Sequence, residues 1–208
     1  MKIKAVLFDM DGVLIDAKDW HYEALNKALR LFGMEISRYD HLHTFDGLPT
    51  KVKLEMIGEQ SYLPEALHSF INQIKQQYTM EMVHSNCKPM FHHEYALSKL
   101  HNQGYKIAVC SNSIRSTIEE MMKYSMLSEY IDLIISNEDV KRAKPDPEMY
   151  QVAISKFGLK PEECIVLEDN PNGVKAGLAS GASVLQVVSV YDVNYQNIRN
   201  KINECEGV

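Results

Sequence analysis

Short, nearly all-apolar segments recur along this chain, and helix-like stretches separate several of them. These segments cover residues 3–8, 105–110, 131–135, 164–167 and 183–188, and most of them are rich in valine or isoleucine. Strands that are apolar throughout are typical of a parallel sheet covered by helices on both faces. The pattern therefore predicts an α/β fold whose core is a doubly wound, Rossmann-like parallel sheet.

Turn residues mark helix boundaries in the second half of the chain. Asp146–Pro147 and Asn170–Pro171 each combine an N-cap residue with a proline at the first helical position. Gly158 and Gly181 follow as stop signals, and Tyr150 belongs to the apolar stripe of the first of these helices. We also expect a helix before the second strand, whereas the polar residues from about 194 fit either a terminal helix or a loose tail.

Residues 17–86 interrupt the alternation, because they contain helix-like stretches and no strand-like run. An amphipathic stretch ends at Gly33, and Pro64 opens another one. A crossover between parallel strands needs about a dozen residues, whereas about a hundred separate the first two predicted strands. We therefore predict a helical cap, residues 17–86, inserted into a Rossmann-like catalytic core of residues 1–16 and 87–208.

The charge balance and the cysteines narrow the class of protein. The chain has 22 Lys and Arg against 28 Asp and Glu, a formal net charge of −6, so we expect no nucleic-acid partner. No apolar run approaches the roughly 18 residues of a membrane span, and the first apolar run reaches Asp9 too soon for a signal peptide. We expect a cytoplasmic protein with no membrane partner and with four free thiols, whose spacing fits no metal pattern.

Polar side chains follow four of the predicted strands at the point where each strand ends. In open parallel sheets, ligands bind beside the carboxyl ends of the strands, so these side chains should meet at one edge. In chain order they are Asp9, Asp11, Ser111, Asn112, Lys144, Glu168 and Asp169.

Carboxylates gathered in this way repel one another, and at least one would be protonated unless a cation lay between them. Ligand sets made only of oxygen select a hard ion such as Mg²⁺. Together with a lysine and a hydroxyl, such an ion would form a site for a dianionic phosphoryl group. Asp9 and Asp11 are two residues apart and point to the same side of extended backbone, so one can attack phosphorus while the other transfers protons.

Four segments carry a specific resemblance. DMDGVLID, CSNS, AKPDP and LEDNPNGVKAG, in this order, resemble the motifs of the haloacid dehalogenase-like hydrolase superfamily, and most closely its phosphatase and phosphoglucomutase branch. In that branch a helical cap is inserted just after the first motif, where residues 17–86 fall. The resemblance covers the whole chain. It implies a magnesium-dependent phosphatase that hydrolyses a small phosphorylated metabolite, such as a sugar phosphate, through a phosphoaspartate.

The resemblance also implies a role for each matching acidic residue. Asp9 would be the nucleophile and a metal ligand. Asp11 would protonate the leaving oxygen, then activate water, and would bind the metal through its backbone carbonyl. Asp169 would ligate Mg²⁺, with Glu168 as a direct or water-mediated partner.

The remaining motif residues would bind phosphate. Ser111 and Lys144 would hold the phosphoryl oxygens, and the lysine would also offset the charge of the nucleophile. Asn112 would contribute through its backbone, and Met10 and Gly12 would present backbone N–H groups.

The predicted cap is less informative. His21, Thr50 and Lys51 match positions that lie near the substrate in phosphoglucomutase-like members, and we expect them to contact the substrate. Thr50 stands where the mutase has an arginine that holds the second phosphate, and Ala17 stands where it has a threonine. Lys51 or Lys53 could compensate, but the pattern favours a solvated helix face for them, and His21 fits a surface or core histidine equally well.

Some neighbours of the motifs have structural interpretations. Asp16 is predicted as the N-cap of the next helix, and Ser111 or Ser113 could cap the helix after the second strand. Arg115 lies just beyond the second motif and could reach phosphate.

Two other functions stay open. A sugar phosphomutase would share the core chemistry but must hold two phosphates, which the residues at 17 and 50 disfavour. A non-catalytic, metabolite-binding regulator would be expected to lack a catalytic carboxylate, and all of them are present. For the phosphatase we expect a small-molecule partner and a monomer or weak dimer.

Overall fold

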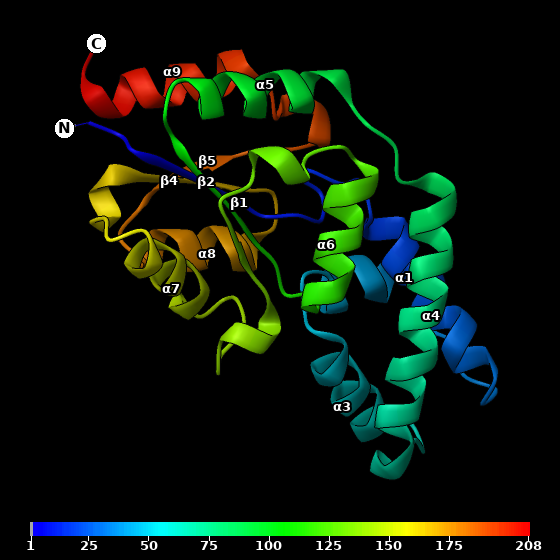
Figure 1. Cartoon of the computed structure of the whole chain (residues 1–208). Helices are drawn as coiled ribbons and strands as arrows, with labels where there is room; N and C mark the ends of the chain where they lie inside the picture. The colour runs from blue at the N-terminus through cyan, green and yellow to red at the C-terminus, as the bar shows by residue number, and fades with distance from the viewer. Residues whose placement is uncertain (1) are drawn as a thin grey trace. The chain divides into compact units, whose positions relative to one another are not determined.

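The computed structural model describes residues 2–208, and its strands form a single parallel sheet (Figure 1). The strands of these residues are β1 (Ala5–Phe8), β2 (Lys106–Cys110), β3 (Leu133–Ile135), β4 (Cys164–Glu168) and β5 (Ser183–Gln186). They lie in the order β3-β2-β1-β4-β5, with every neighbouring pair parallel. The predicted α/β fold with a doubly wound parallel sheet is confirmed.

Helices connect the strands and fill the long insertion. The α-helices are α1 (Lys18–Arg30), α2 (Arg38–Asp40), α3 (Thr50–Gln60), α4 (His68–Asn86), α5 (Phe91–Asn102), α6 (Arg115–Tyr124), α7 (Glu148–Lys156), α8 (Pro171–Ala179) and α9 (Tyr195–Glu206). The short helices are η1 (His41–Phe45), which is a π-helix, and the 3₁₀ turns η2 (Glu65–Leu67), η3 (Ser128–Tyr130), η4 (Asn137–Asp139), η5 (Pro161–Glu163) and η6 (Val190–Asp192). Of the two forms open to the polar C-terminal segment, the structure has the helix.

The chain divides into two compact units, each with its own buried core. The first comprises the residues up to Asp16 together with Lys88–Val208 and is called the core unit below. The second comprises Ala17–Cys87 and is called the helical unit. Cys87 belongs to the helical unit, whereas the predicted boundary assigned it to the core. That the two units act as catalytic core and cap stays a prediction.

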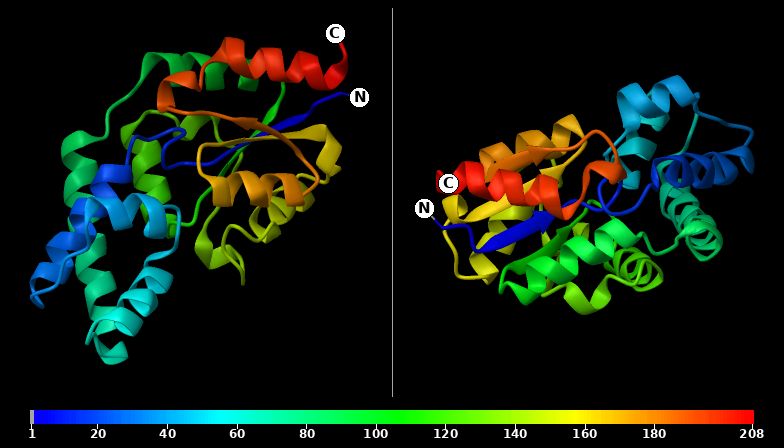
Figure 2. Two further views of the ribbon diagram at one scale, coloured as in Figure 1. Left: turned by 180° about the vertical axis from the view of Figure 1, so that it is seen from behind. Right: turned by 90° about the horizontal axis from the view of Figure 1, so that it is seen from above.

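Helices of the core unit cover both faces of the sheet. Helices α5 and α9 pack together on one face, and α7 and α8 lie on the other (Figure 1). The view from behind in Figure 2 shows the same separation. Alternate strand residues such as Leu7, Cys110 and Val166 form one buried cluster with Tyr150 and Ala153 of α7. All the residues of β1 are buried, as expected for a strand between two helical layers.

Helix α8 approaches the sheet closely because Gly177 has no side chain. A Cβ at this position would lie 2.9 Å from Cγ2 of Val184 and 3.1 Å from Cγ1 of Val166. Both distances are shorter than an ordinary van der Waals contact. The glycine therefore sets how near the helix can come to β4 and β5.

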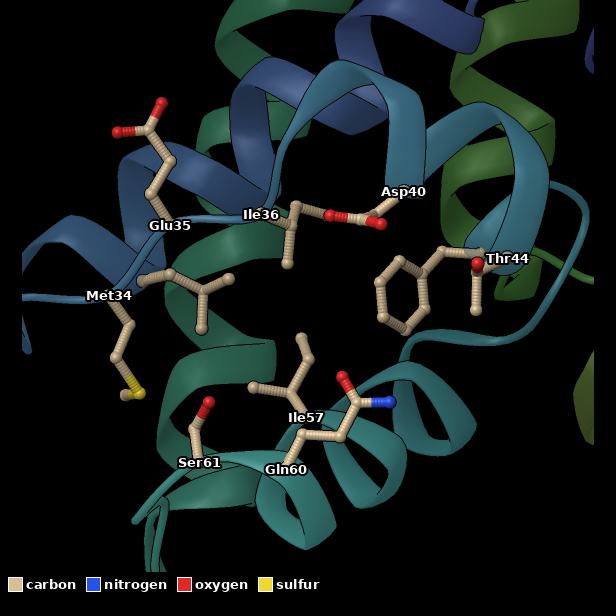
Figure 3. A pocket seen from close by; sticks show the side chains of 10 residues that line it. Met34, Glu35, Ile36, Asp40, Thr44, Ile57, Gln60 and Ser61 are labelled. Atoms are coloured by element: carbon tan, nitrogen blue, oxygen red, sulfur yellow. The ribbon is translucent and has the colours of Figure 1, made fainter.

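In the helical unit, an apolar core joins α1, η1, α3 and α4. Asn26 of α1 is fully buried in it, and its side chain forms hydrogen bonds with both backbone groups of Ile36, at 2.9 and 3.0 Å. This pair anchors the segment after α1, because buried backbone groups require partners. A pocket of about 180 Å³ opens next to this segment. Figure 3 shows Ile36 and Ile57 pointing into it, whereas the carboxylate of Glu35 points away.

Several predicted helix starts differ in detail. Asp16 is exposed and does not cap α1, because the N-cap is Ala17 and no side chain accepts a hydrogen bond there. Pro64 precedes the short turn η2 rather than the long helix itself. The N-cap of α7 is Pro147, one residue later than predicted. The side chain of Asp146 still accepts the N–H of Glu148, in the first turn, at 3.0 Å. Among residues 2–208, no helix has both the length and the apolarity needed to cross a membrane.

Candidate active site

The register of the central strands brings their last residues to one level. Phe8 of β1 is paired with Val109 on one side and with Leu167 on the other. The residues that follow, Asp9 and Glu168 among them, therefore lie side by side at the carboxyl edge of the sheet. The strand order also reverses its direction around β1, and such a switch point is where open parallel sheets bind ligands.

Lys144 joins the two carboxylates at this edge. Its Nζ donates to Oδ1 of Asp9 at 2.7 Å, to Oε1 of Glu168 at 2.7 Å and to the backbone oxygen of Cys110 at 2.8 Å. These three bonds use all the donors of an ammonium group. The side chains of Lys144 and Glu168 are 5% and 1% exposed, so the ion pairs are shielded from water.

The electrostatics of the cluster follow from this burial. Burial is the largest cause that raises the pKa of Asp9 well above its usual range, and the nearby charge of Glu168 raises it further, against the opposing effect of Lys144. Burial also disfavours the charge of Lys144, but Asp9 and Glu168 outweigh it, so the pKa of the ammonium is raised. The edge thus holds more negative charge than one lysine compensates, and a cation would stabilise it.

Three of these carboxylates are arranged so that they could share a metal ion. Asp9, Glu168 and Asp169 each offer an oxygen, and the three oxygens lie within 4.8 Å of one another. Oε2 of Glu168 is buried and has no hydrogen-bond partner. A buried carboxylate oxygen without a donor is costly, and a hard cation is the partner that its chemistry suits. The residues present therefore fit a divalent ion bound by oxygen ligands.

Asp11 lies beside this group but does not contribute its side chain to it. Its Oδ2 is 3.4 Å from Oγ of Ser113, which donates to it. The expectation that Asp11 contacts a metal through its backbone carbonyl stays a prediction.

The loop after β1 is closed by its own backbone. The carbonyl of Met10 accepts the N–H groups of Leu14 and Ile15, both at 2.9 Å. Gly12 has a φ of 87°, and its N–H donates to the carbonyl of Ile15 at 2.7 Å. The turn already uses the Gly12 N–H in this structure, and the expectation that this group faces a phosphate stays a prediction. For Met10 the corresponding expectation stays a prediction.

The loop after β2 is tied to the loop that carries Lys144. The side chain of Asn112 accepts the N–H of Lys144 at 3.2 Å and donates to its carbonyl at 3.5 Å. Ser111 is 1% exposed, and its hydroxyl oxygen accepts the N–H of Ser113 at 3.1 Å. Neither serine caps α6, whose N-cap is Ile114. Ser111 is thus held at the edge by its neighbours.

Arg115 is engaged elsewhere in the core unit. Its guanidinium donates to Oδ2 of Asp139 at 2.7 Å and to the carbonyl of Ile134 at 3.1 Å. These contacts tie α6 to β3 and η4, which favours a structural role over the suggested contact with phosphate.

Tyr150 is a member of the cluster that the sequence pattern did not reveal. It lies on α7, is fully buried, and donates its hydroxyl to Oε1 of Glu168 at 2.5 Å. Its ring centre is 4.8 Å from Nζ of Lys144. In the sequence, Tyr150 fits the apolar stripe of its helix. The only signal of its role is that this core position carries a hydroxyl group, which an apolar stripe does not require.

The residues of the helical unit that are predicted to contact substrate differ in their exposure and in their contacts. Thr50 begins α3, and Lys51 is largely exposed, with Glu55 at 4.0 Å. Lys53 is only 7% exposed, so it is the less solvated of the two lysines considered. Nδ1 of His21 is 3.2 Å from Nζ of Lys75, which is 6% exposed. The helical unit therefore contains nearly buried cationic side chains.

No histidine of the described residues belongs to the carboxylate cluster. His41 and His93 are buried, and burial lowers the pKa of each to about 4. Both rings are therefore neutral at physiological pH. The four cysteines are free thiols in the described part of the chain, as expected.

Comparison with known proteins adds relatives to this geometry. The family model described as haloacid dehalogenase-like hydrolase matches residues 6–187. The pyrophosphatase PpaX of Bacillus cereus (strain AH820) is 29% identical over 201 residues, which cover 90% of this chain and 84% of the relative.

Solved structures show the same fold. β-Phosphoglucomutase from Clostridium difficile superposes with a TM-score of 0.85 at 22% identity, covering 99% of this chain and all of the other. CbbY from Rhodobacter sphaeroides, solved in complex with phosphate, gives a TM-score of 0.78 at 21% identity and covers 88% of this chain and 84% of its own.

Proposed function

This chain belongs to the haloacid dehalogenase-like hydrolase family, and we propose that it is a magnesium-dependent phosphatase acting on a small phosphorylated metabolite through a phosphoaspartate. One observation supports this most directly: the Asp9 carboxylate contacts the Lys144 ammonium and lies close to two further carboxylates at the edge of the sheet. An aspartate in these surroundings can act as a nucleophile whose charge is balanced by fixed groups.

The reaction has two steps. In the first, a carboxylate oxygen of Asp9 forms a bond to phosphorus, the bond to the leaving oxygen breaks, and Asp11 gives its proton to that oxygen. In the second, Asp11 takes a proton from water while the water oxygen attacks phosphorus and the bond to Asp9 breaks. Inorganic phosphate leaves, and both carboxyl groups return to their starting states.

The other residues provide charge and position. Lys144 donates to Asp9, opposes the rise in the pKa of this carboxyl, and would meet the phosphoryl oxygens together with the Ser111 hydroxyl. Asp9, Glu168 and Asp169 would hold the metal. A bound Mg²⁺ would supply positive charge that offsets the carboxylates and polarises the phosphoryl group.

We assign substrate choice to the helical unit, with His21, Thr50 and Lys51 as the side chains to test and Lys53 as the alternative to Lys51. Sugar phosphates are the first candidates. The name of the Bacillus relative favours inorganic pyrophosphate as a second candidate. The fold shared with β-phosphoglucomutase keeps a mutase in consideration, although Thr50 lacks the cationic group that a second phosphate would need.

The mechanism is tested by Asp9→Asn, measured as phosphate released from a panel of phosphorylated metabolites and from pyrophosphate. We expect activity that needs Mg²⁺, disappears with a chelator and falls by at least about 10³-fold in the variant. Asp19→Asn is the matched control, because Asp19 forms an exposed ion pair with Arg38 and should be dispensable.

The covalent step is tested on the wild-type protein. Acid quenching during turnover followed by borohydride reduction should convert residue 9 into homoserine, which peptide mass spectrometry locates. Full turnover by Asp9→Asn would refute the mechanism. Conversion of a hexose 1-phosphate to its 6-phosphate without release of phosphate would replace the phosphatase by the mutase. We propose that the enzyme works in the cytoplasm as a monomer or weak dimer. Size-exclusion chromatography tests the oligomeric state.

A further inference from the structure

The two oxygens of the Glu168 carboxylate have different surroundings. Oε1 accepts two hydrogen bonds, from the Tyr150 hydroxyl at 2.5 Å and from Nζ of Lys144 at 2.7 Å. Oε2 is buried and accepts none. The carboxylate is therefore held by one oxygen, and the other is left for a different kind of partner.

We propose that Tyr150 is a positioning residue that fixes Glu168 so that Oε2 is presented to the metal ion. The proposal rests on the proposed function, since it assumes that Glu168 takes part in binding that ion. The tyrosine would not touch substrate or metal. It would act by holding one oxygen of a ligand so that the other has a single orientation.

A count of donors shows why the lysine cannot do this by itself. The ammonium of Lys144 divides its three donors among Asp9, Glu168 and the carbonyl of Cys110. It therefore has none left for a second bond to Glu168. The other hydrogen bond to Oε1 comes from Tyr150, which is fully buried, so water cannot readily replace its hydroxyl.

The backbone of α8 also lies against this carboxylate. A Cβ at Gly173 of α8 would overlap the carboxylate of Glu168. The carboxylate therefore lies directly on the first turn of α8, and Tyr150 and Lys144 also hold its Oε1 atom. These contacts leave it little freedom to rotate, so loss of the hydroxyl would remove one of the three constraints.

The same tyrosine also touches the lysine. The 4.8 Å between its ring centre and Nζ is within the range of a cation–π contact. Phenylalanine would keep the ring beneath the ammonium and would fill the same space. The substitution Tyr150→Phe therefore removes only the hydrogen bond to Glu168, which makes it a clean test of the hydroxyl.

The experiment measures binding of Mg²⁺ to the full chain by calorimetry, without substrate, for the wild type and for Tyr150→Phe. We expect the dissociation constant to rise by about 10- to 100-fold in the variant. We also expect kcat to recover toward the wild-type value at saturating Mg²⁺. Tyr105→Phe is the control, because Tyr105 lies in the same unit and its hydroxyl accepts a hydrogen bond from Arg199 at 3.1 Å.

A purely structural role would give a different result. It would lower the melting temperature in chelator and leave the dissociation constant for Mg²⁺ within about twofold of the wild type, and this outcome would overturn the proposal. Gly173→Ala is the second variant, since its Cβ would displace the same carboxylate, and it should weaken Mg²⁺ binding too. If Tyr150→Phe does not fold, unchanged Mg²⁺ binding by Gly173→Ala overturns the proposal. If the wild type itself binds no Mg²⁺, both the proposed function and the proposed role of Tyr150 fail.

Discussion

His93 should make the core unit sensitive to acid, and replacing it by glutamine should remove that sensitivity. The ring is 1% exposed, and its Nε2 is 2.8 Å from the carbonyl of Val190. Burial lowers the pKa of His93 from 6.5 to about 4, and hydrogen bonds to the backbone of Val190 and Leu14 offset this only in part. Glutamine can still donate to a carbonyl but does not titrate.

The sign and size of the effect follow from linkage. The folded state has the lower pKa, so the unfolded chain takes up the proton first as the pH falls. The stabilisation is therefore complete above about pH 6.5 and is lost progressively as the pH falls toward about 4. For these two values the loss between about pH 7.5 and about pH 5 is about 2 kcal/mol.

The assay compares urea unfolding of the wild type and His93→Gln at about pH 7.5, 6 and 5. The variant should start less stable, and the difference between the two proteins should shrink by about 2 kcal/mol at the lowest pH. His92→Gln is the control, because His92 is only partly buried and contacts the same carbonyl at 3.2 Å. Parallel curves for the wild type and His93→Gln, or an NMR titration of the folded His93 ring near pH 6.5, would refute the reasoning.

Three substitutions test other parts of the structure. Lys144→Met should lower kcat by about 10²- to 10³-fold at saturating Mg²⁺, because it removes the buried counter-charge of two carboxylates, and steady-state kinetics measures this. Asn26→Ala should cost about 2–4 kcal/mol of unfolding free energy in urea, since it leaves both backbone groups of Ile36 unpaired. Gly177→Ala should cost about 1–3 kcal/mol in the same assay, because its Cβ would press on Val184.

The sheet could be predicted from the sequence because its strands are buried on both faces. Such strands are apolar at every position, so the signal does not depend on an amphipathic period. Their ends were less certain: the predicted strand at 131–135 begins only at Leu133, because Tyr130 ends a 3₁₀ turn and Ile131 follows it. Ile131 is apolar although it lies outside the strand, so apolar composition alone does not show where the strand begins.

The chemistry of the site was predictable where it depends on strand ends and not where it depends on packing between elements. Asp9, Glu168 and Asp169 meet because the strands that precede them are neighbours in the sheet. The place of Tyr150 depends on how α7 rotates against the sheet, and its spacing is that of any core residue. The difference between Lys51 and Lys53 likewise reflects which face of α3 is covered, and the weak amphipathicity of that helix gives no sign of it.

The strand order also explains why position 144 has a long side chain that ends in a compact cation. The loop that carries it follows β3, which is separated from the central strand β1 by β2. Its side chain must therefore pass the end of β2 to reach Asp9, and on the way it donates to the carbonyl of Cys110, the last residue of that strand. Asn112, just beyond β2, holds the backbone of Lys144 on both sides, so the start of this reach is fixed as well as its end. A long, flexible stem with a compact charge is suited to this path, whereas the wide guanidinium of arginine could not fit among three acceptors at 2.7–2.8 Å in a space that is nearly closed to water.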